Sequence, residues 1–167
     1  MSRSRMAAVP TALAWAGAFL ALVGYACLFR ETYIDDAYIT LQYARTLADS
    51  LTWGFHPGHA ANTATSPLNV VALALFGLPF QPTVGAVAWL TGAELAAMLW
   101  VLPRISRRVT GTAHFGVIAF AGLVANPLLV SAIGLEGHLY ALLMLVAVAL
   151  FCEARWIPSG SPSACSH

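Results

Sequence analysis

The sequence has little charge, and its positive charge comes from one residue type. Charged residues make up 9% of the 167 positions and hydrophobic residues 59%, and all eight basic residues are arginine. Soluble domains carry closer to about 25% charged residues, so this composition indicates an integral membrane protein. The formal net charge of only +1 lacks the basic excess that nucleic-acid binding needs, and we expect no nucleic-acid partner.

Cysteine is also scarce. The three cysteines, Cys27, Cys152 and Cys165, are odd in number and have no metal-ligand spacing. Two of them lie in or beside apolar segments, where a free cysteine behaves as a small hydrophobic residue. The sequence therefore predicts no disulfide framework, and it contains no internal repeat.

Long apolar segments dominate the rest of the chain. Four are predicted to cross a membrane as helices, at about residues 7–29, 83–103, 113–133 and 136–153. The first exceeds the roughly 7–15 apolar residues of a signal peptide and can cross a bilayer core of about 30 Å, so we expect it to remain uncleaved. The predicted fold class is all-α integral membrane, with residues 1–157 as one transmembrane domain and 158–167 as a disordered tail.

Arginine positions predict the orientation of these spans. Arg3 and Arg5 precede the first span and place the N-terminus in the cytoplasm by the positive-inside tendency. Residues 30–82 then form an outer loop, in which the apolar stretch 68–80 is too short to cross and is predicted to lie at the membrane surface. With that stretch outside, the later spans bring four further arginines to the cytoplasmic side: Arg104, Arg107, Arg108 and Arg155.

The outer loop begins with an amphipathic segment. Apolar residues recur every three or four positions from Ile34 to Leu51, which predicts a surface helix of about four turns. Asp35 is predicted to be its N-cap, with Asp36 in the first turn, where the helix dipole favours negative charge. The glycine- and proline-containing residues 53–59 then break helicity. With the stretch 68–80, the loop contributes two juxtamembrane helices.

Three carboxylates are the catalytic candidates: Asp35, Asp36 and Glu136. The predicted topology brings all three to the outer ends of spans, where low dielectric favours holding a cation or taking a proton. Asp36 and Glu136 are also candidate oxygen ligands for a divalent metal, Mg²⁺ or Mn²⁺. The alternatives are structural: an N-cap with a dipole-complementing acid for the pair, and an interfacial acid marking a helix start for Glu136.

Other polar side chains in or facing the loop are candidate substrate-binding residues. They offer hydroxyl, amide, guanidinium or imidazole groups suited to sugar or phosphate oxygens: Tyr43, Arg45, Asn62, Thr65, Ser66 and His138. Each of these residues also has a structural alternative. Asn62, Thr65 and Ser66 are residue types that are common in turns. Arg45 fits snorkelling to lipid headgroups, and Tyr43 fits an interfacial aromatic belt. His56 and His59 are further candidates, and Glu94, in the middle of a span, is an intramembrane acid with either a functional or a structural role.

Four short elements, in order, resemble a known family. Residues 35–45 (DDAYITLQYAR), 53–58 (WGFHPG), 65–68 (TSPL) and 134–136 (GLE) resemble the first outer loop, and a later span end, of GT-C-type membrane glycosyltransferases. The closest likeness is to bacterial arabinofuranosyltransferase-like and mannosyltransferase-like members. His56 and Asn69 stand where those proteins usually have Asn and Trp, and the segment 61–63 (ANT) also departs from their pattern.

The resemblance implies a function and a location. Such enzymes transfer a sugar from a polyprenyl-phosphate donor to a glycan, lipid or protein acceptor outside the cytoplasm, so it implies a multi-pass protein of the bacterial inner membrane. It implies that Asp35 or Asp36 acts as general base or metal ligand and that Glu136 lines the same cavity. The resemblance covers residues 7–155, the N-terminal portion of such enzymes, and we therefore expect this chain to be a fragment of a glycosyltransferase.

Two readings from other classes remain open. One is a non-catalytic small membrane protein, or a truncated remnant, that binds a lipid-linked sugar or a partner protein. The other is a fragment of an ion-coupled transporter, for which the intramembrane acid Glu94 is the motivating residue.

Overall fold

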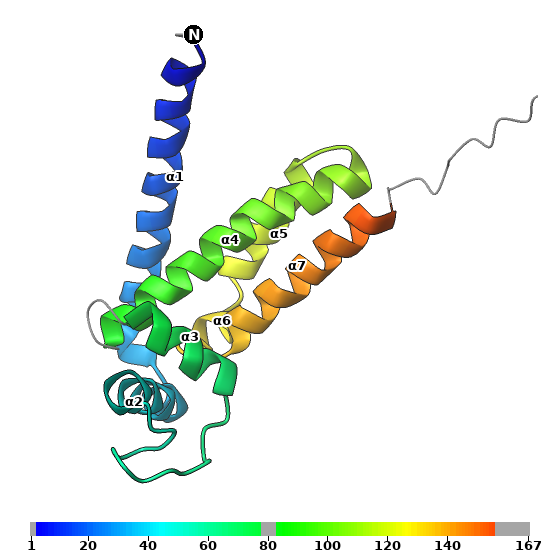
Figure 1. Ribbon diagram of the computed structural model, residues 1–167. Coiled ribbons are helices and arrows are strands. Elements are labelled where there is room, and N and C mark those ends of the chain that lie inside the picture. The colour runs from blue at the N-terminus through cyan, green and yellow to red at the C-terminus, as the bar shows by residue number, and fades with distance from the viewer. Residues whose placement is uncertain (1–2, 78–82, 156–167) are drawn as a thin grey trace, which may run out of the picture.

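The computed structural model describes residues 3–77 and 83–155, and over these residues it is helical with no β-strand. This confirms the predicted all-α class. The helices, in chain order, are α1 (Arg3–Leu28), the short 3₁₀ helix η1 (Arg30–Thr32), α2 (Asp35–Ser50), α3 (Pro67–Gly77), α4 (Val84–Thr110), α5 (His114–Val124), α6 (Pro127–Ser131) and α7 (Gly137–Arg155) (Figure 1). The predicted disordered tail, residues 158–167, lies outside the described residues.

Two of the described helices, α4 and α7, are long and apolar enough to cross a membrane. They lie side by side along much of their length (Figure 1). The exposed surface of α7 is strongly apolar, with large side chains such as Leu143, Met144 and Phe151 facing outward. Such a surface suits a lipid environment, since a large exposed apolar surface on a water-soluble protein promotes aggregation.

Helix α4 is the shared neighbour of α1, α3, α5 and α7. It meets α1 at Gly92, where an added Cβ would come within 2.5 Å of Val23 Cγ2. Next to this contact the rings of Phe19 and Trp89 lie 5.5 Å apart between centroids. The missing side chain at position 92 therefore lets the two helix backbones approach closely, as small residues do in helix pairs within membranes.

The end of α4 differs from its predicted end. The sequence predicts a span ending at Pro103, but the helix continues to Thr110 and ends at Gly111, whose φ of +78° accommodates a left-handed cap. A proline in a helix interior removes one hydrogen bond and crowds the carbonyl four residues earlier, yet α4 continues through Pro103. Gly116 of α5 packs closely against the backbone of Leu102 and Pro103 at this point. The arginines of the last turn complement the helix dipole.

The predicted span 113–133 is not one helix. Helix α5 ends at Val124, and α6 begins at Pro127. Asn126 is the N-cap of α6, and its side chain accepts a hydrogen bond from the backbone N–H of Leu128. The asparagine cap and the proline in the first helical turn together start a new helix, so the predicted span is interrupted at this dipeptide.

Helices α2 and α3 form a small layer across the end of α4 where that helix begins (Figure 1). The buried core beneath them contains Tyr43 of α2, Leu73 of α3 and Val87 of α4, together with Ile133 from the turn before α7. The predicted short helix over 68–80 is seen as α3, Pro67–Gly77, and residues 78–80 lie outside the described part.

The predicted N-cap at Asp35 is wrong. Ile34, in extended conformation, is the N-cap residue of α2, and it makes no side-chain cap hydrogen bond. Its backbone carbonyl accepts the N–H of Ala37 at 2.9 Å, so the helix starts one residue earlier than a capping aspartate would require. Asp35 and Asp36 instead both occupy the first turn, where the positive end of the helix dipole stabilises a carboxylate.

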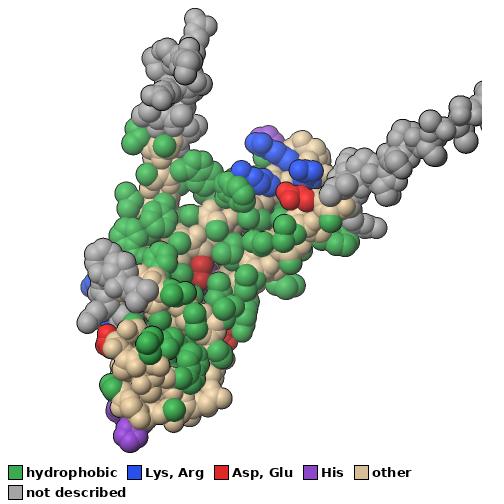
Figure 2. Space-filling model, viewed as in Figure 1, with side chains coloured by type: hydrophobic (Ala, Val, Ile, Leu, Met, Phe, Trp, Pro, Cys, Tyr) green, Lys and Arg blue, Asp and Glu red, His purple; other side chains and the backbone are tan. Residues whose placement is uncertain are grey.

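Charged side chains separate into two ends of the structure. Arg104, Arg107 and Arg108 gather near the C-terminal end of α4, close to the end of α7 (Figure 2). Asp35 and Asp36 lie at the opposite end of α4, in the layer of α2 and α3. The body between these two ends is largely apolar, as the sequence pattern indicates.

Candidate functional site

The centre of the candidate site is a contact between the starts of two helices. The hydroxyl of Ser66, just before α3, donates a hydrogen bond to Oε2 of Glu136, just before α7. Ser66 is fully buried and Glu136 is half-buried. The contact leaves the second carboxylate oxygen of Glu136 outside this bond, so the site holds one oriented acid at the edge of the core.

A second bond fixes the same two segments. The amide Nδ2 of Asn69, in the first turns of α3, donates to the backbone oxygen of Gly134 at 3.0 Å. Asn69 is buried, and a buried amide that loses its partner costs about 1–3 kcal/mol. Ser66 and Asn69 therefore attach the beginning of α3 to the turn that carries Glu136.

The first turn of α2 packs against this turn as well. Gly134 has φ +91°, and a Cβ added to it would lie 2.9 Å from Cβ of Ala37. Both its backbone conformation and its surroundings thus require glycine. Because Ala37 follows Asp36 directly, the approach brings the pair of aspartates to the same end of the molecule as Glu136.

The two aspartates are not equivalent in position. Asp36 precedes the buried residues Thr40 and Tyr43 by four and seven positions, so it lies on the packed side of α2. Asp35 lies about 100° further around the helix, away from that row. Both are exposed, and Asp36 is the one whose side of the helix borders the core.

Among the candidate substrate-binding residues, Tyr43 has a structural setting. Its ring is fully buried, and its hydroxyl lies 2.6 Å from Oγ1 of Thr63 and accepts the backbone N–H of the same residue at 3.1 Å. It also donates toward the backbone oxygen of Ala61 at 3.3 Å. Tyr43 thus holds the loop after α2 onto the helix layer instead of presenting its hydroxyl to a ligand.

The remaining loop candidates are more peripheral. Asn62 is exposed, and its Oδ1 accepts a hydrogen bond from the indole of Trp53 at 3.4 Å. Thr65 is exposed next to the buried Ser66. Arg45 follows Asp36 by about two and a half helical turns, so it projects from the opposite side of α2. The structure therefore does not bring Arg45 together with Asp36.

His138 lies close to Glu136, in the first turn of α7. It is only 3% exposed, and its Nδ1 has no hydrogen-bond partner within the described residues. A buried nitrogen without a partner is uncommon and carries a desolvation cost. Of the three candidate histidines only this one is near Glu136. His56 and His59 lie at the exposed tip of the loop, where their backbones are joined by a hydrogen bond.

Glu94 is separate from this site. It is a buried acid in α4, 5% exposed, and its Oε1 has no partner in the part of the chain that the structure describes. It follows the first residue of α4 by ten positions, about 15 Å along the helix. It remains an unexplained buried acid.

Residues that could hold a metal are few. No group of three or more His, Cys, Asp or Glu side chains gathers within residues 3–77 and 83–155. Asp36 and Glu136, the predicted ligands, supply carboxylate oxygens at the same end of the molecule, and one oxygen of Glu136 already accepts from Ser66. Any divalent cation at this end would take most of its shell from water or from a substrate phosphate, as Mg²⁺ usually does.

Two residues of the site, Asn69 and Gly134, are absent from the sequence-based candidates. Asn69 is the one polar residue between Leu68 and Phe76, and a lone amide in an apolar helix signals a buried hydrogen bond. Gly134 opens the GLE element, but the need for glycine there comes from its positive φ and from the approach of Ala37, which is distant in sequence.

Comparison with known proteins adds no relative. No protein-family model, no curated protein and no solved structure matches this chain. The candidate site therefore rests on the contacts of its own residues.

Proposed function

We propose that this chain forms part of a membrane glycosyltransferase site, in which the first turn of α2 and the turn before α7 bind a polyprenyl-phosphate sugar and an acceptor. The observation that carries the proposal is the contact of Ser66 with Glu136, beside the approach of Ala37 to Gly134. These contacts join the segments that resemble GT-C glycosyltransferases, although they are about 70 and 100 residues apart in the chain. If these segments were only local turns, nothing would require them to contact one another.

The chemistry needs one base and one leaving group. A carboxylate of the aspartate pair, Asp36 by its position, takes the proton of the acceptor hydroxyl. The acceptor oxygen then forms a bond to the anomeric carbon of the sugar, and the bond from that carbon to the phosphate oxygen breaks. Polyprenyl phosphate leaves with the electron pair, and the carboxylic acid later returns its proton to solvent. Glu136, oriented by Ser66, lines the same cavity and fixes the reacting sugar through its hydroxyl groups.

The membrane setting is part of the proposal. α1, α4, the α5–α6 pair and α7 would cross the inner membrane of a bacterium, with the aspartates outside and the N-terminus and the arginines of α4 in the cytoplasm. The separation of the arginines from the aspartates along α4 supports this orientation. Single cysteines at Ser50, Gly137 and Ser106, in a chain whose native cysteines are replaced, test it. The first two should react with an impermeant thiol reagent outside, and labelling of position 106 from outside would refute it.

The activity test uses the full chain in liposomes. Polyprenyl-phosphate mannose and polyprenyl-phosphate arabinofuranose are supplied as donors, and release of polyprenyl phosphate is measured in the presence of an oligosaccharide acceptor. Loss of a general base reduces rates by about 100-fold or more, so Asp36→Asn should abolish turnover while donor binding stays within about twofold. Asp49→Asn, which removes an exposed aspartate near the other end of α2, is the matched control. Unchanged turnover in Asp36→Asn would exclude Asp36 as the base.

A divalent metal is tested in the same assay. Asp36 and Glu136 would hold Mg²⁺ or Mn²⁺, which would neutralise charge on the donor phosphate. Chelation by EDTA should then lower turnover, and either metal should restore it. Turnover that is indifferent to EDTA would leave these carboxylates with base and substrate-binding roles alone.

A second candidate function is non-catalytic binding of a lipid-linked sugar or of a partner. The engagement of Glu136 by Ser66 favours it, since a carboxylate already bonded within the protein is less available to a reacting substrate. This candidate predicts saturable binding of the donors with no release of polyprenyl phosphate. Measured release that depends on Asp36 would exclude it.

A further inference from the structure

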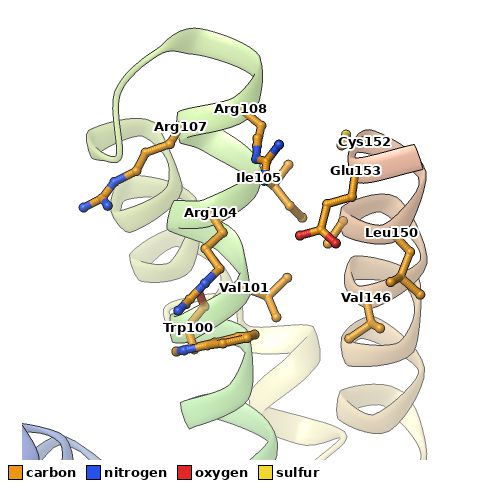
Figure 3. Close-up of a pocket in the computed structure, with 11 residues that line it drawn as sticks. Trp100, Val101, Arg104, Ile105, Arg107, Arg108, Val146, Leu150, Cys152 and Glu153 are labelled. Carbon is orange, nitrogen blue, oxygen red and sulfur yellow. The ribbon is translucent and has the colours of Figure 1, made fainter. Parts of the chain in front are cut away.

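A groove lies between α4 and α7 at the arginine end, far from the candidate site. It encloses about 370 Å³. Its apolar floor comes from Val101 of α4 and Val146 of α7, which face the space between the helices (Figure 3), with the largely exposed Leu150 of α7 at its edge. We call this the α4–α7 groove. Both helices that are able to cross a membrane therefore contribute apolar side chains to the groove.

The mouth of the groove is positively charged. Arg104, Arg107 and Arg108 line it, and among the described residues Glu153 of α7 is the one acidic side chain of the lining. Arg108 and Glu153 point toward each other across the opening (Figure 3), but neither forms an ion pair within residues 3–77 and 83–155. Arg107 extends from the side of α4 away from α7 (Figure 3), so Arg104 and Arg108 stand against the one carboxylate of Glu153 and leave a net positive charge among these three groups.

One arginine is held in place. The guanidinium carbon of Arg104 lies 3.4 Å from the ring centroid of Trp100, and its Nη1 donates to the backbone oxygen of Trp100 at 2.7 Å. Such stacking limits the freedom of the side chain. The remaining N–H groups of the guanidinium stay available for an anion, which arginine binds well because of its planar, forked donors.

The depth of the groove fits the boundary of a bilayer. Arg104 follows Val84 by about 20 residues, which is about 30 Å along a helix. This matches the thickness of the hydrocarbon core. With α4 crossing the membrane, its arginines reach the level of the lipid phosphates, and Trp100 takes the interfacial position that tryptophan prefers. The apolar floor of the groove then lies at the depth of the acyl chains.

We propose that the α4–α7 groove binds an anionic phospholipid, with its phosphate at Arg104 and Arg108 and an acyl chain along Val101, Val146 and Leu150. Charge complementarity selects an anionic headgroup. A zwitterionic headgroup also carries a positive group, which the arginines repel and which only the carboxylate of Glu153 could attract. The apolar floor selects a lipid over free phosphate. Basic pockets between membrane helices bind anionic headgroups for the same reasons.

The test is native mass spectrometry of the full chain released from detergent, titrated with phosphatidylglycerol, with phosphatidylcholine of the same acyl chains, or with inorganic phosphate. We expect phosphatidylglycerol to bind about tenfold more tightly than phosphatidylcholine, a ratio typical of one charge-assisted bond. Inorganic phosphate should not displace it.

Variants separate headgroup from chain recognition. Arg108→Gln should weaken phosphatidylglycerol binding about tenfold, whereas the matched control Arg30→Gln, at the other end of the molecule, should change it less than twofold. Ala149→Trp fills the groove without changing its charge and should also weaken binding. Glu153→Gln removes the opposing carboxylate and should tighten it. All four positions are at least partly exposed, so the variants keep the buried core intact.

Three results would overturn the proposal. Equal affinity for phosphatidylglycerol and phosphatidylcholine would remove the charge selection. Displacement by inorganic phosphate, with no effect of Ala149→Trp, would reduce the site to a free-anion site. A dimer that persists in excess phosphatidylglycerol and that Ala149→Trp disrupts would show that a second copy of the chain occupies the groove.

Discussion

The hydroxyl of Tyr43 lies 2.6 Å from Oγ1 of Thr63 and joins helix α2 to the loop that follows it. The same hydroxyl accepts the backbone N–H of Thr63 and lies 3.3 Å from the backbone oxygen of Ala61. One buried phenol thus holds a loop that is otherwise largely exposed. The loop leads directly to Ser66, so its position affects the candidate site.

The first prediction concerns this phenol. Tyr43→Phe keeps the buried ring and removes these bonds, so unfolding should become easier by about 1 kcal/mol. The loop 52–65 should also be cut faster by a protease, because it loses its bonds to Tyr43 and is left with those of Gln42 and Thr46 to the backbone oxygen of Phe55. Thermal melting in detergent and limited proteolysis measure the two effects. Tyr38→Phe, on the exposed side of the same helix, is the control, and equal cleavage of both variants would contradict the prediction.

The second prediction concerns the packing of α1 on α4. Gly92→Ala would place a methyl group 2.5 Å from Val23 Cγ2 and 3.1 Å from its Cα, and the helices must move apart. Overpacking of this kind costs about 1–3 kcal/mol, although alanine is the better helix former. Gly24→Ala, which meets nothing within 4 Å, should leave the melting temperature unchanged or higher. A stabilised Gly92→Ala variant would show that the two helices can separate freely.

The third prediction concerns the contact at the candidate site. Ser66→Ala removes the donor to Glu136 and should lower stability by about 1–3 kcal/mol. A double-mutant cycle with Glu136→Ala isolates the pair, and residues in direct contact show coupling of about 0.5–3 kcal/mol. Ser131→Ala, which removes an exposed hydroxyl bonded within its own helix, should show no coupling to Glu136. Additive effects of Ser66→Ala and Glu136→Ala would mean that the contact contributes nothing.

The fourth prediction concerns alkaline pH. Burial, with smaller contributions from Cys27 and Tyr38, raises the pKa of Tyr33 to about 12 from an ordinary value of 10.0. The folded state therefore holds the phenolic proton more tightly than the unfolded state. Stability from this group is complete below pH 10 and is lost as pH rises from 10 toward 12.

The measurement is thermal melting in detergent between pH 8 and pH 11.5. Wild type should lose stability relative to Tyr33→Phe only above pH 10, since phenylalanine has no proton to lose. At pH 8 the variant should be at least as stable, because the buried hydroxyl of Tyr33 has no partner within the described residues. Tyr140→Phe removes an exposed tyrosine hydroxyl and serves as the control. Parallel curves for wild type and Tyr33→Phe would refute the prediction.

Local patterns made the all-helical class and several of the individual helices predictable. The spacing of apolar residues in α2 indicates a helix because its buried residues, Ala37, Leu41 and Ala44 among them, recur on one side. Asn126 and Pro127 are a local signal for the interruption before α6, since both act through their own backbone neighbours, but the apolar pattern predicts a single span over 113–133. By contrast, Pro103 does not end α4, and the helix continues until Gly111 supplies the left-handed cap.

The site was predictable only in pieces. Ser66 and Glu136 each stand out in the sequence as polar residues in turns, but their contact depends on how α3 and α7 meet around α4. Gly134 depends on Ala37 in the same way. Tyr43 shows the opposite case. The sequence predicts that its hydroxyl contacts a substrate, but the side chain is buried and the hydroxyl bonds to Thr63 instead. Separations of 20 to about 100 residues are beyond the reach of a local pattern.

The shared contacts of α4 imply an order of assembly during synthesis. As the ribosome extends the chain, α1 is made first, and Val23 cannot be buried against Gly92 until α4 has been made. α2 and α3 can settle on the start of α4 at the same stage. Glu136 arrives only with α7, so the hydroxyl of Ser66 stays without this acceptor until α7 docks. The candidate site is thus completed late, and a chain interrupted before α7 would lack both Glu136 and the helix that positions it.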